Sequence, residues 1–590
     1  MFAAQHYAVL AVFIVACWGF GRALLSRVGA PVRRDAVLEA AMAVALGIGL
    51  FIVGFQALAI AGVFGLAGVL ALAGVGVAAA AVQAPAALRA WRGAPGHAPL
   101  SWLDKGALTV LALVAIPALV APLAPPAAFD ELMYHLPYAR TVAETGTLGI
   151  HDWLRYPWFP YNVNLLYAAA LLVQDDVSPH FVNGLAGALA VVMVYRLGLA
   201  HTNRVIACGG AAIWLGLGDY SNALIDMGVA LFVLAGCVAL WWWRDADRPR
   251  SARWLCVAAF CLGLAAGAKY QALTFLPLMG LFVLWYERRP KVLALALLCL
   301  LIPCIYWYAR NAITTGDPFN PIGARLFGFT NWNEADYKNQ FDDVRAHAAL
   351  PNAVIWPVLF APFSPLFRRS AAVRAAVVFC AYSLIVWFAT SRYPRYMTAS
   401  YPLIALMAAV GWTVIGSAIV GGVRKLSPSL AAKAWWPRVG AVVGGALLLA
   451  MVAACVHQTT AKVAMVSPTP ELREAFLRKN VPGYAAMHYL REHQNDPQQG
   501  RTYQVALSEA IYYGPDAVWG DTLGPWRYSD FLAAPADEMA RKFRSLGFGS
   551  LVVSTAFLAP LAAKPGFDNH FVLLYEKDGA KAYRILADAP

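Results

Sequence analysis

Long apolar segments recur from the amino terminus to about residue 456 of this 590-residue chain. An α-helix needs about 20 apolar residues to cross a bilayer, and most of these segments approach that length. Hydrophobic residues make up 60% of the sequence and charged residues only 13%, which is too little polar surface for a soluble protein of this size. The sequence therefore predicts an all-α polytopic membrane protein. Its transmembrane helices, about fourteen in number, are expected at residues 7–25, 38–60, 63–83, 106–124, 179–199, 205–218, 224–243, 254–267, 271–287, 291–308, 352–367, 373–390, 396–419 and 438–456.

The distribution of lysine and arginine predicts which loops face the cytoplasm. Every second loop is basic, beginning with residues 26–37, which hold Arg33 and Arg34, and ending with residues 420–437, which hold Lys433. If these loops are cytoplasmic, both chain ends lie outside. The formal net charge of +13 is typical of such loops, so nucleic-acid binding is not expected. No basic stretch precedes the first apolar segment, which is expected to remain as a membrane helix and not to be removed as a signal peptide.

The composition changes after residue 456. In residues 457–590 the long apolar runs stop and charged residues become more frequent. The stretch "EMARKFRSLGF" has helical spacing, "GSLVVST" is typical of a strand, and "FVLLYEKDGAKAYRIL" is typical of a hairpin that turns at Asp578 and Gly579. We expect a small α/β domain on the outer side of the membrane.

Two adjacent carboxylates, Asp130 and Glu131, follow the fourth apolar segment in "PPAAFDELMYHLPYAR". Asp130 could simply cap a helix that lies along the membrane surface. Alternatively, partial desolvation near lipid raises its basicity and fits it to act as a base. His135 could assist Glu131 or face a phosphate, although a local hydrogen bond is the simpler expectation. Asp219 and Asp226 in "GDYSNALIDMG" could line the same pocket, but we interpret them as caps.

Basic residues recur at the predicted outer ends of helices, where the positive-inside tendency opposes them. Snorkelling towards lipid phosphate is one explanation for each of them. A phosphate-binding pocket at head-group depth would explain why several occur together. The candidate substrate-binding residues are these cations and the tyrosines beside them: Lys269, Tyr270, Arg310, Arg392, Tyr393, Arg395 and Tyr396.

A carboxylate opposite a set of cations suits the transfer of a sugar away from a phosphate. Breaking the bond between sugar C1 and phosphate requires stabilisation of the leaving group's charge, which arginine and lysine supply. A carboxylate can take the proton from the incoming hydroxyl or amine. We find no nucleotide-phosphate motif, and a donor anchored in lipid would not need one.

The early Asp-Glu pair, the aromatic and proline-rich loop "HDWLRYPWFPY" and the outer tail together resemble the GT-C membrane glycosyltransferases. The nearest relatives would be the protein O-mannosyltransferase-like group and the lipid A aminoarabinose transferase. The stretch "YPRYMTASYPLIALMAAVGW" resembles a late helix of that family. The resemblance implies a GT-C-like core at residues 105–456, with outer loops at 125–178 and 309–351, followed by the C-terminal domain at 457–590. Residues 1–104 would be extra N-terminal helices.

The resemblance also implies a polyprenyl-phosphate sugar donor, an inverting transfer on the outer side of the membrane, and Asp130 as catalytic carboxylate with Glu131 beside it. The acceptor would be a glycolipid, a polysaccharide or a protein. The Ala-rich composition and the periplasm-like tail suggest a bacterial inner membrane. No cofactor is expected. A divalent metal occurs in some GT-C branches, for which Asp342 and Asp343 form a weak candidate site. The nine cysteines lie in apolar segments without metal-type spacing, so neither disulfides nor a thiolate zinc site is expected.

Three other functions remain as alternatives. A transporter or flippase needs ionisable or helix-breaking groups near the bilayer midplane, whereas the charges here lie mostly at segment ends. A polysaccharide polymerase or ligase of the cell envelope also has many spans and large outer loops, but has less need of an early Asp-Glu pair. A scaffold or receptor that uses the tail domain would leave the Asp130 loop unexplained.

Overall fold

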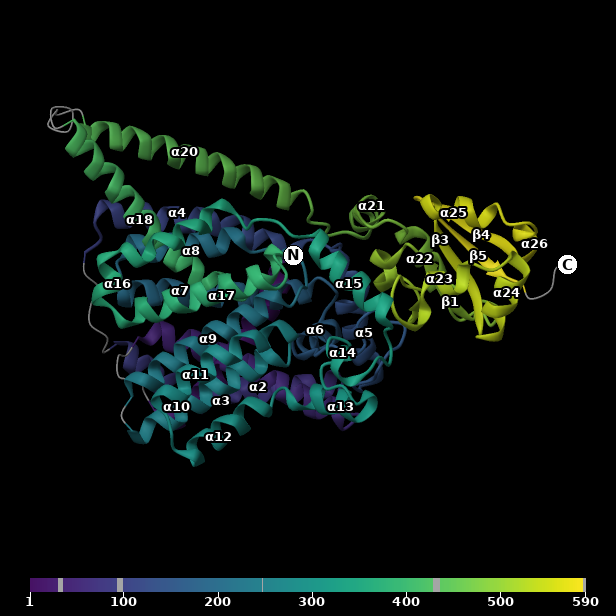
Figure 1. Ribbon diagram of the computed structural model, residues 1–590, viewed down its shortest axis with the longest axis horizontal. Helices are drawn as coiled ribbons and strands as arrows, with labels where there is room; N and C mark the ends of the chain where they lie inside the picture. Colours follow the sequence, from purple (N-terminus) through teal and green to yellow (C-terminus); the bar gives the residue numbers. More distant parts are fainter. Residues whose placement is uncertain (30–34, 93–98, 247, 428–435, 587–590) are drawn as a thin grey trace.

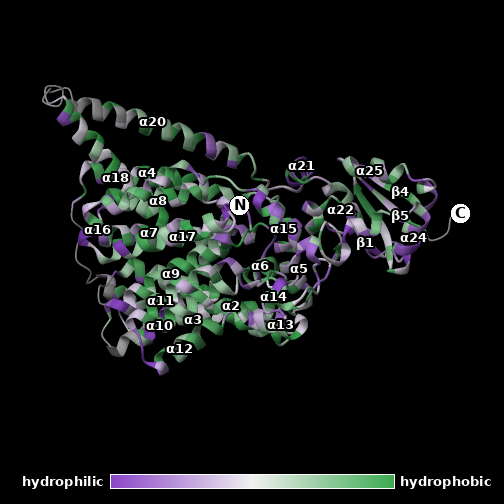
Figure 2. Ribbon diagram, viewed as in Figure 1, coloured by the Kyte–Doolittle hydropathy of each residue, from purple (hydrophilic) through white to green (hydrophobic). Residues whose placement is uncertain are grey.

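A computed structural model describes residues 1–29, 35–92, 99–246, 248–427 and 436–586. Arg33, Arg34 and Lys433, on which part of the sidedness prediction rests, lie outside these ranges. The chain forms a large helical bundle followed by a small domain with a β-sheet, as the sequence predicts (Figure 1). Apolar residues dominate the bundle, and hydrophilic residues gather at its ends and over the small domain (Figure 2).

Each of the fourteen predicted segments contains a helix, as far as the described residues extend. Nine described helices are long and apolar enough to cross a membrane. These are α1 (Phe2–Val28), α2 (Ala36–Ile60), α3 (Leu66–Arg92), α4 (Trp102–Val120), α7 (Ser178–His201), α9 (Asp226–Asp245), α17 (Ala371–Ala389), α18 (Tyr401–Leu426) and α20 (Trp436–Val463).

The other five predicted segments hold shorter or broken helices. The segment at 291–308 bends by 75° between two helices, α12 (Pro290–Leu301) and α13 (Ile305–Thr315), which would make a tenth span if counted together. The remaining four segments contain shorter apolar helices, which neighbouring helices help to cover. These are α8 (Arg204–Leu217), α10 (Arg248–Ala266), η3 (Tyr270–Phe275) with α11 (Leu276–Tyr286), and η4 (Ala353–Phe363).

Short elements connect the long helices. The first predicted outer loop holds the π-helix η2 (Glu131–His135) and two helices, α5 (Leu136–Thr145) and α6 (Asn162–Val173). The remaining short elements are η1 (Ala121–Leu123), α14 (Ala324–Phe327), α15 (Glu334–Ala346), α16 (Pro365–Arg369) and η5 (Pro394–Met397).

Contacts between loops separate the two ends of the bundle. We call the end that carries the small domain the tail end, and the opposite end, where the predicted cytoplasmic loops lie, the basic end (Figure 1). At each end, described loops that the charge pattern assigns to the same side contact one another. At the basic end Arg196 pairs with Asp35, Arg204 pairs with Asp104, and Arg253 donates to the carbonyl of Arg27. At the tail end His6 contacts Asp175, and Arg473 pairs with Asp176.

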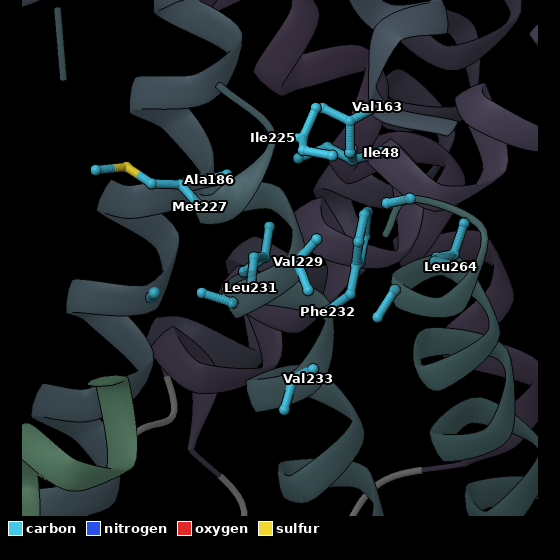
Figure 3. Packing of buried hydrophobic residues seen from close by; sticks show 14 of the residues in the cluster. Ile48, Val163, Ala186, Ile225, Met227, Val229, Leu231, Phe232, Val233 and Leu264 are labelled. Atoms are coloured by element: carbon cyan, nitrogen blue, oxygen red, sulfur yellow. The ribbon is translucent and has the colours of Figure 1, made fainter. Parts of the chain in front are cut away.

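The most enclosed of the nine candidate spans is α9, with 83% of its most apolar window buried. Its side chains Val229, Phe232 and Val233 pack among residues from several neighbouring helices (Figure 3). Ile48 of α2, Val163 of α6, Ala186 of α7 and Leu264 of α10 lie around it (Figure 3). This packing holds the first residue of α9, Asp226, in a fixed position at the tail end.

The small C-terminal domain contains one five-stranded sheet in the order β2-β1-β3-β5-β4. The first three strands are parallel, and β5 pairs antiparallel with β3 and β4. The predicted hairpin turns at Asp578 and Gly579, which both have positive φ angles, 51° and 78°, as a tight hairpin turn requires. The strands are β1 (Arg501–Val505), β2 (Val518–Trp519), β3 (Phe548–Ser554), β4 (Phe571–Lys577) and β5 (Ala580–Ile585).

Helices cover this sheet and connect it to the bundle. The predicted helix "EMARKFRSLGF" corresponds to α24 (Ala536–Ser545), whose Phe543 packs on Tyr503 and Phe548. The other helical elements are α21 (Pro470–Asn480), α22 (Tyr484–Glu492), η6 (Ser508–Tyr513), η7 (Gly524–Trp526), α23 (Tyr528–Leu532), α25 (Thr555–Ala562) and α26 (Phe567–His570).

Candidate active site

Four charged side chains from separate segments meet at the tail end: Asp130, Asp226, Lys269 and Arg395, which we call the acid–base cluster. The Nη1 of Arg395 donates to Asp130, and its Nε donates to Asp226 over 3.0 Å. The Nζ of Lys269 donates to the other oxygen of Asp226 over 2.6 Å. The side chains of Asp130, Asp226, Lys269 and Arg395 are 24%, 12%, 17% and 24% exposed, so the cluster is accessible to a substrate.

Each member stands at the end of an element. Asp226 is the first residue of α9, and Lys269 directly precedes η3. Arg395 lies in η5, a short 3₁₀ turn that leads into α18. Asp130 directly precedes the π-helix η2, and its side chain makes no capping hydrogen bond there. The interpretation of Asp130 as a helix cap is therefore wrong.

The wide π-turn gives Asp130 and Glu131 different surroundings. Glu131 is fully buried, and one of its oxygens lies 2.5 Å from Nε2 of His180 in α7. That oxygen also accepts from the backbone N–H of Ala223, and the second oxygen accepts from the N–H groups of Ala127 and Ala128. Glu131 thereby joins the segment before Asp130 to the segment before Asp226, and it holds the two acidic members of the cluster in place.

His135 and Tyr134 lie behind the cluster. The Nδ1 of His135 is 3.1 Å from the amide nitrogen of Asn164, so the expected local hydrogen bond is present. Burial lowers the pKa of His135 to about 3 despite the charge of Asp130, and the ring is therefore neutral. The Tyr134 ring packs against the rings of His135 and Tyr156.

The turn before α18 contributes aromatic contacts to the cluster. The ring of Tyr396 lies 5.3 Å from Nζ of Lys269, within the range of a cation–π contact. Tyr393 packs on Tyr396, with ring centroids 5.0 Å apart. Arg392 is exposed and points elsewhere, over the ring of Phe388 at 4.5 Å.

Arg310 and Tyr270 belong to a neighbouring aromatic region. The guanidinium of Arg310 lies 5.1 Å and 5.9 Å from the rings of Trp307 and Trp158. The hydroxyl of Tyr270 is buried against the carbonyls of Trp158 and Asn320, and it joins the two outer loops. Within the described chain, no hydrogen bond or ion pair joins Arg310, Tyr270 or Arg392 to the acid–base cluster.

The electrostatics of Asp130 differ from the sequence expectation. Burial disfavours its charged form, but the adjacent Arg395, with a smaller effect from Lys269, outweighs burial and holds the pKa of Asp130 below its usual range. The expectation that desolvation raises its basicity is therefore not met in this state. Asp130 is an ionised, paired carboxylate at neutral pH.

Two residues of this site were not predicted from the sequence. We interpreted Asp226 as a cap, but no capping bond is present, and its carboxylate joins the two cations. An acidic residue at the start of the long apolar stretch "MGVALFVLAGCVAL" was the signal, because ionisable groups there are costly. Asp219, in contrast, accepts only local bonds from Ser221 among the described contacts. No sequence pattern marked His180.

A metal site is not evident among the described residues, where no group of three His, Cys, Asp or Glu side chains is close enough to hold an ion. Asp342 and Asp343 lie on α15 and pair weakly with Arg345 and His347, at 3.4 and 3.8 Å.

Comparison with known proteins adds two family matches. Residues 223–292 match the family described as the protein O-mannosyl-transferase TMEM260 N-terminal domain. This match spans Asp226 and Lys269. Residues 472–584, most of the C-terminal domain, match the family described as SF2091/S2213. An uncharacterised protein of Shigella flexneri, SF2092/S2214, is 27% identical over 138 residues, which are 21% of this chain and 74% of that relative.

Two solved structures have a similar arrangement. ArnT from Cupriavidus metallidurans bound to undecaprenyl phosphate aligns with 82% of this chain and 99% of its own, at 15% identity and a TM-score of 0.49. The oligosaccharyltransferase AglB from Archaeoglobus fulgidus, in complex with an inhibitory peptide and a dolichol-phosphate, aligns with 82% of this chain and 74% of its own, at 14% identity and a TM-score of 0.47. The match at residues 223–292 confirms, over that stretch of the chain, the predicted resemblance to the protein O-mannosyltransferase group.

Proposed function

We propose that this protein transfers a sugar from a polyprenyl-phosphate donor to an acceptor at the outer face of the membrane, with Asp130 as the base. The observation that carries the proposal is the acid–base cluster, in which a partly exposed carboxylate stands beside two cations at the end of the helices. The alternative function, a transporter or flippase, is less well supported, because the acid–base cluster lies at the ends of helices and not near their centres.

Arg395 and Lys269 are suited to hold the phosphate of the donor. A guanidinium presents two parallel N–H donors to phosphate oxygens, and an ammonium adds a compact positive charge. Both groups are already oriented by Asp226, so they need little reorganisation when charge develops on the leaving phosphate. Tyr396 lies beside Lys269 and could contact the sugar or the phosphate.

Donor binding would prepare Asp130 for its role as base. In the free protein Arg395 holds Asp130 ionised and weakly basic. Phosphate oxygens compete with Asp130 for the same guanidinium, and a carboxylate that loses its partner in a partly buried site becomes more basic. Basicity would therefore rise once the donor is in place.

The reaction itself balances without a further reactant. The oxygen of the acceptor's hydroxyl group, or the nitrogen of its amine group, attacks sugar C1. The proton of that group moves to Asp130. The bond between C1 and the phosphate oxygen breaks, and the polyprenyl phosphate leaves with the electron pair. Attack opposite the leaving group inverts the configuration at C1. The acceptor is a glycolipid, a polysaccharide or a protein, and the setting is a bacterial inner membrane with the C-terminal domain in the periplasm.

The experiment is a comparison of cells that carry the wild-type gene, no gene, or the Asp130→Asn variant. Mass spectrometry of surface glycans and glycolipids identifies the product that disappears with the gene. We expect Asp130→Asn to lower its formation by at least about 100-fold, because general-base catalysis contributes about 10² to 10⁴. Protein levels should not change, since Asn fills the same space.

The matched control is Asp219→Asn. Asp219 is an exposed carboxylate a few residues before α9, and it bonds locally to Ser221. That variant should form the product at the wild-type rate. Normal product formation by Asp130→Asn would remove the proposed mechanism.

A further inference from the structure

A cavity separate from the acid–base cluster lies where the first predicted outer loop meets the C-terminal domain. Its volume is about 510 Å³, within the range of small-molecule sites. Residues of α5 and α6 form one side, and residues of α21, α22 and η6 form the other. We propose that this cavity binds an oligosaccharide segment, a part of the acceptor remote from the reacting end; the acceptor role rests on the proposed function.

Tyrosine rings supply flat apolar surface in the cavity. Tyr484, Tyr512 and Tyr513 line it. Tyr513 packs edge-on against Tyr484 and Tyr512, with ring planes 80° and 72° apart. His488 stacks on Tyr484, and the Arg140 guanidinium lies 5.5 Å from the Tyr512 ring, so a ligand would meet the ring surface that these groups leave free. The C–H faces of sugar rings pack against such aromatic faces, whose polar ends also hydrogen-bond.

The charged groups that line the cavity are balanced in sign. Arg473 donates to Asp176 over 2.6 Å, and Arg140 lies 3.9 Å from Glu144. Hydroxyl groups need donors and acceptors together, which guanidinium and carboxylate groups provide. A phosphate or polyanion would favour an excess of cations, and a lipid tail would favour an apolar lining. The three arginines are Arg140, Arg473 and Arg491, and the three carboxylates are Glu144, Asp175 and Asp176.

One buried donor in this lining is unsatisfied. Arg140 is 5% exposed, and its Nη atoms donate to the backbone carbonyls of residues 512 and 514–516. Its Nε has no hydrogen-bond partner among the described residues, the nearest carboxylate oxygen being that of Glu144 at 3.9 Å. A buried polar group without a partner is costly, so a ligand oxygen at this position would be favoured.

The wall of the cavity is connected to the support of the acid–base cluster. The hydroxyl of Tyr513 donates to the carbonyl of Pro126, which lies four residues before Asp130, over 2.7 Å. Asp176 lies near the start of α7, the helix whose His180 contacts Glu131. An acceptor bound in the cavity is thus anchored to the same loop that carries Asp130.

The test uses the full-length protein in lipid nanodiscs and measures binding by saturation-transfer NMR. The probes are the uncharged trisaccharides maltotriose and triacetylchitotriose, with inorganic phosphate as a separate arm. We expect at least one trisaccharide to bind. Ala143→Trp, which places a large ring in the cavity wall, should weaken that binding at least tenfold, and Arg491→Ala should weaken it several-fold.

The matched controls are Ala143→Ser, which keeps the cavity open, and Asp219→Asn, at a residue that does not line the cavity. Both should bind the trisaccharide as the wild type does. Binding that Ala143→Trp leaves unchanged, binding of phosphate alone, or no trisaccharide binding at millimolar concentration would each overturn the inference. Failure of the proposed function would show separately, as product formation by Asp130→Asn despite normal trisaccharide binding.

Discussion

Asp130 and Glu131 are chemically similar neighbours whose environments give them different tasks. Asp130 is partly exposed and pairs with Arg395, whereas Glu131 is fully buried with His180 and three backbone N–H groups. A buried carboxylate with all its acceptor sites used has little capacity to accept another proton or contact a substrate. We therefore assign the chemistry to Asp130 and a positioning role to Glu131.

Removing Arg395 should change the pH dependence of transfer. Arg395 lowers the pKa of Asp130 and opposes the effect of burial, so in Arg395→Gln that pKa should rise. The base must be ionised, and the acidic limb of kcat/KM reports the free enzyme, so the limb should move to higher pH by about one to three pH units. The overall rate should also fall, because a phosphate ligand is lost.

The control for that measurement is Arg392→Gln, three residues earlier. Arg392 is exposed over Phe388 and has no bond to Asp130 among the described contacts. The acidic limb of kcat/KM for Arg392→Gln should coincide with that of the wild type. An Arg395→Gln limb that does not move would contradict the pairing.

Glu131 and His180 should matter more for stability than for chemistry. In Glu131→Ala, the buried His180 and three backbone N–H groups lose their partner. Breaking a buried pair of this kind costs about 3 to 5 kcal/mol, so the thermal unfolding temperature in detergent should drop clearly. Asp130→Asn should lower the unfolding temperature less, because the paired carboxylate is partly exposed and Arg395 keeps Asp226 as a partner. A Glu131→Ala protein of normal stability that does not transfer sugar would instead place Glu131 in the chemistry.

Sequence reasoning identified part of this site. Asp130, Lys269 and Arg395 stood out because charges at the ends of apolar segments require an explanation. Arg310 and Arg392 carried the same signal, yet the fold places them against aromatic rings. The difference depends on which distant segments meet, and a single sequence does not contain that information. The same limit explains why Asp226 was interpreted as a cap.

At the scale of elements, close helix packing depends on small residues. Gly411 of α18 faces η4, where an added Cβ would lie 1.7 Å from the carbonyl oxygen of Pro357. Gly416 of the same helix has no atom within 4 Å of such a Cβ. Small residues let membrane helices approach this closely, since packing is a main source of their association.

These two glycines give a matched pair of variants. Gly411→Ala should destabilise the protein by about 1 to 3 kcal/mol, the usual cost of overpacking. Gly416→Ala should be neutral or stabilising by up to about 1 kcal/mol, because alanine favours the helix. Thermal unfolding of both in the same detergent measures the difference. Equal unfolding temperatures would show that α18 and η4 can move apart at little cost.

Element types followed from the sequence more readily than their shapes. Runs of about 20 apolar residues predict helices because a bilayer demands them. The break between α12 and α13 falls at Pro303, and η4 contains Pro357 and Pro362. Proline removes a backbone N–H and disrupts the helix, but the direction that the chain takes after the break depends on the neighbouring helices. The π-turn at η2 has no comparable sequence signature.

At the scale of the molecule, the charge pattern predicts a sidedness that labelling can test. Ser545→Cys, exposed on α24, should react in intact cells with a thiol reagent that cannot cross the membrane. Arg288→Cys, exposed at the basic end, should react only after the membrane is opened. The wild type, whose nine cysteines lie in the membrane part, gives the background. The opposite pattern would invert the predicted topology.

Sequence alone predicted a separate C-terminal domain but not where it sits. Its attachment combines apolar packing with polar contacts between distant segments, such as Arg155 with Asp521 and Trp526 with Asp152. Arg527 adds a contact to Asp336 of the second outer loop. The charged residues among these look like ordinary surface charges in the sequence, so their partners could not be predicted.

The hydrogen bonds from Arg140 of α5 to the C-terminal domain limit how that domain can move. Its guanidinium donates hydrogen bonds to four backbone carbonyls of the C-terminal domain, at residues 512 and 514–516. Separating the domain from α5 would break these four hydrogen bonds together, and a hydrogen bond to a charged group contributes about 1.5 to 3 kcal/mol. We therefore expect the C-terminal domain to keep a fixed position relative to α5 and not to open and close over the bundle. If the proposed lipid-linked donor binds at the acid–base cluster, it would therefore have to arrive from the membrane, without an opening of this domain.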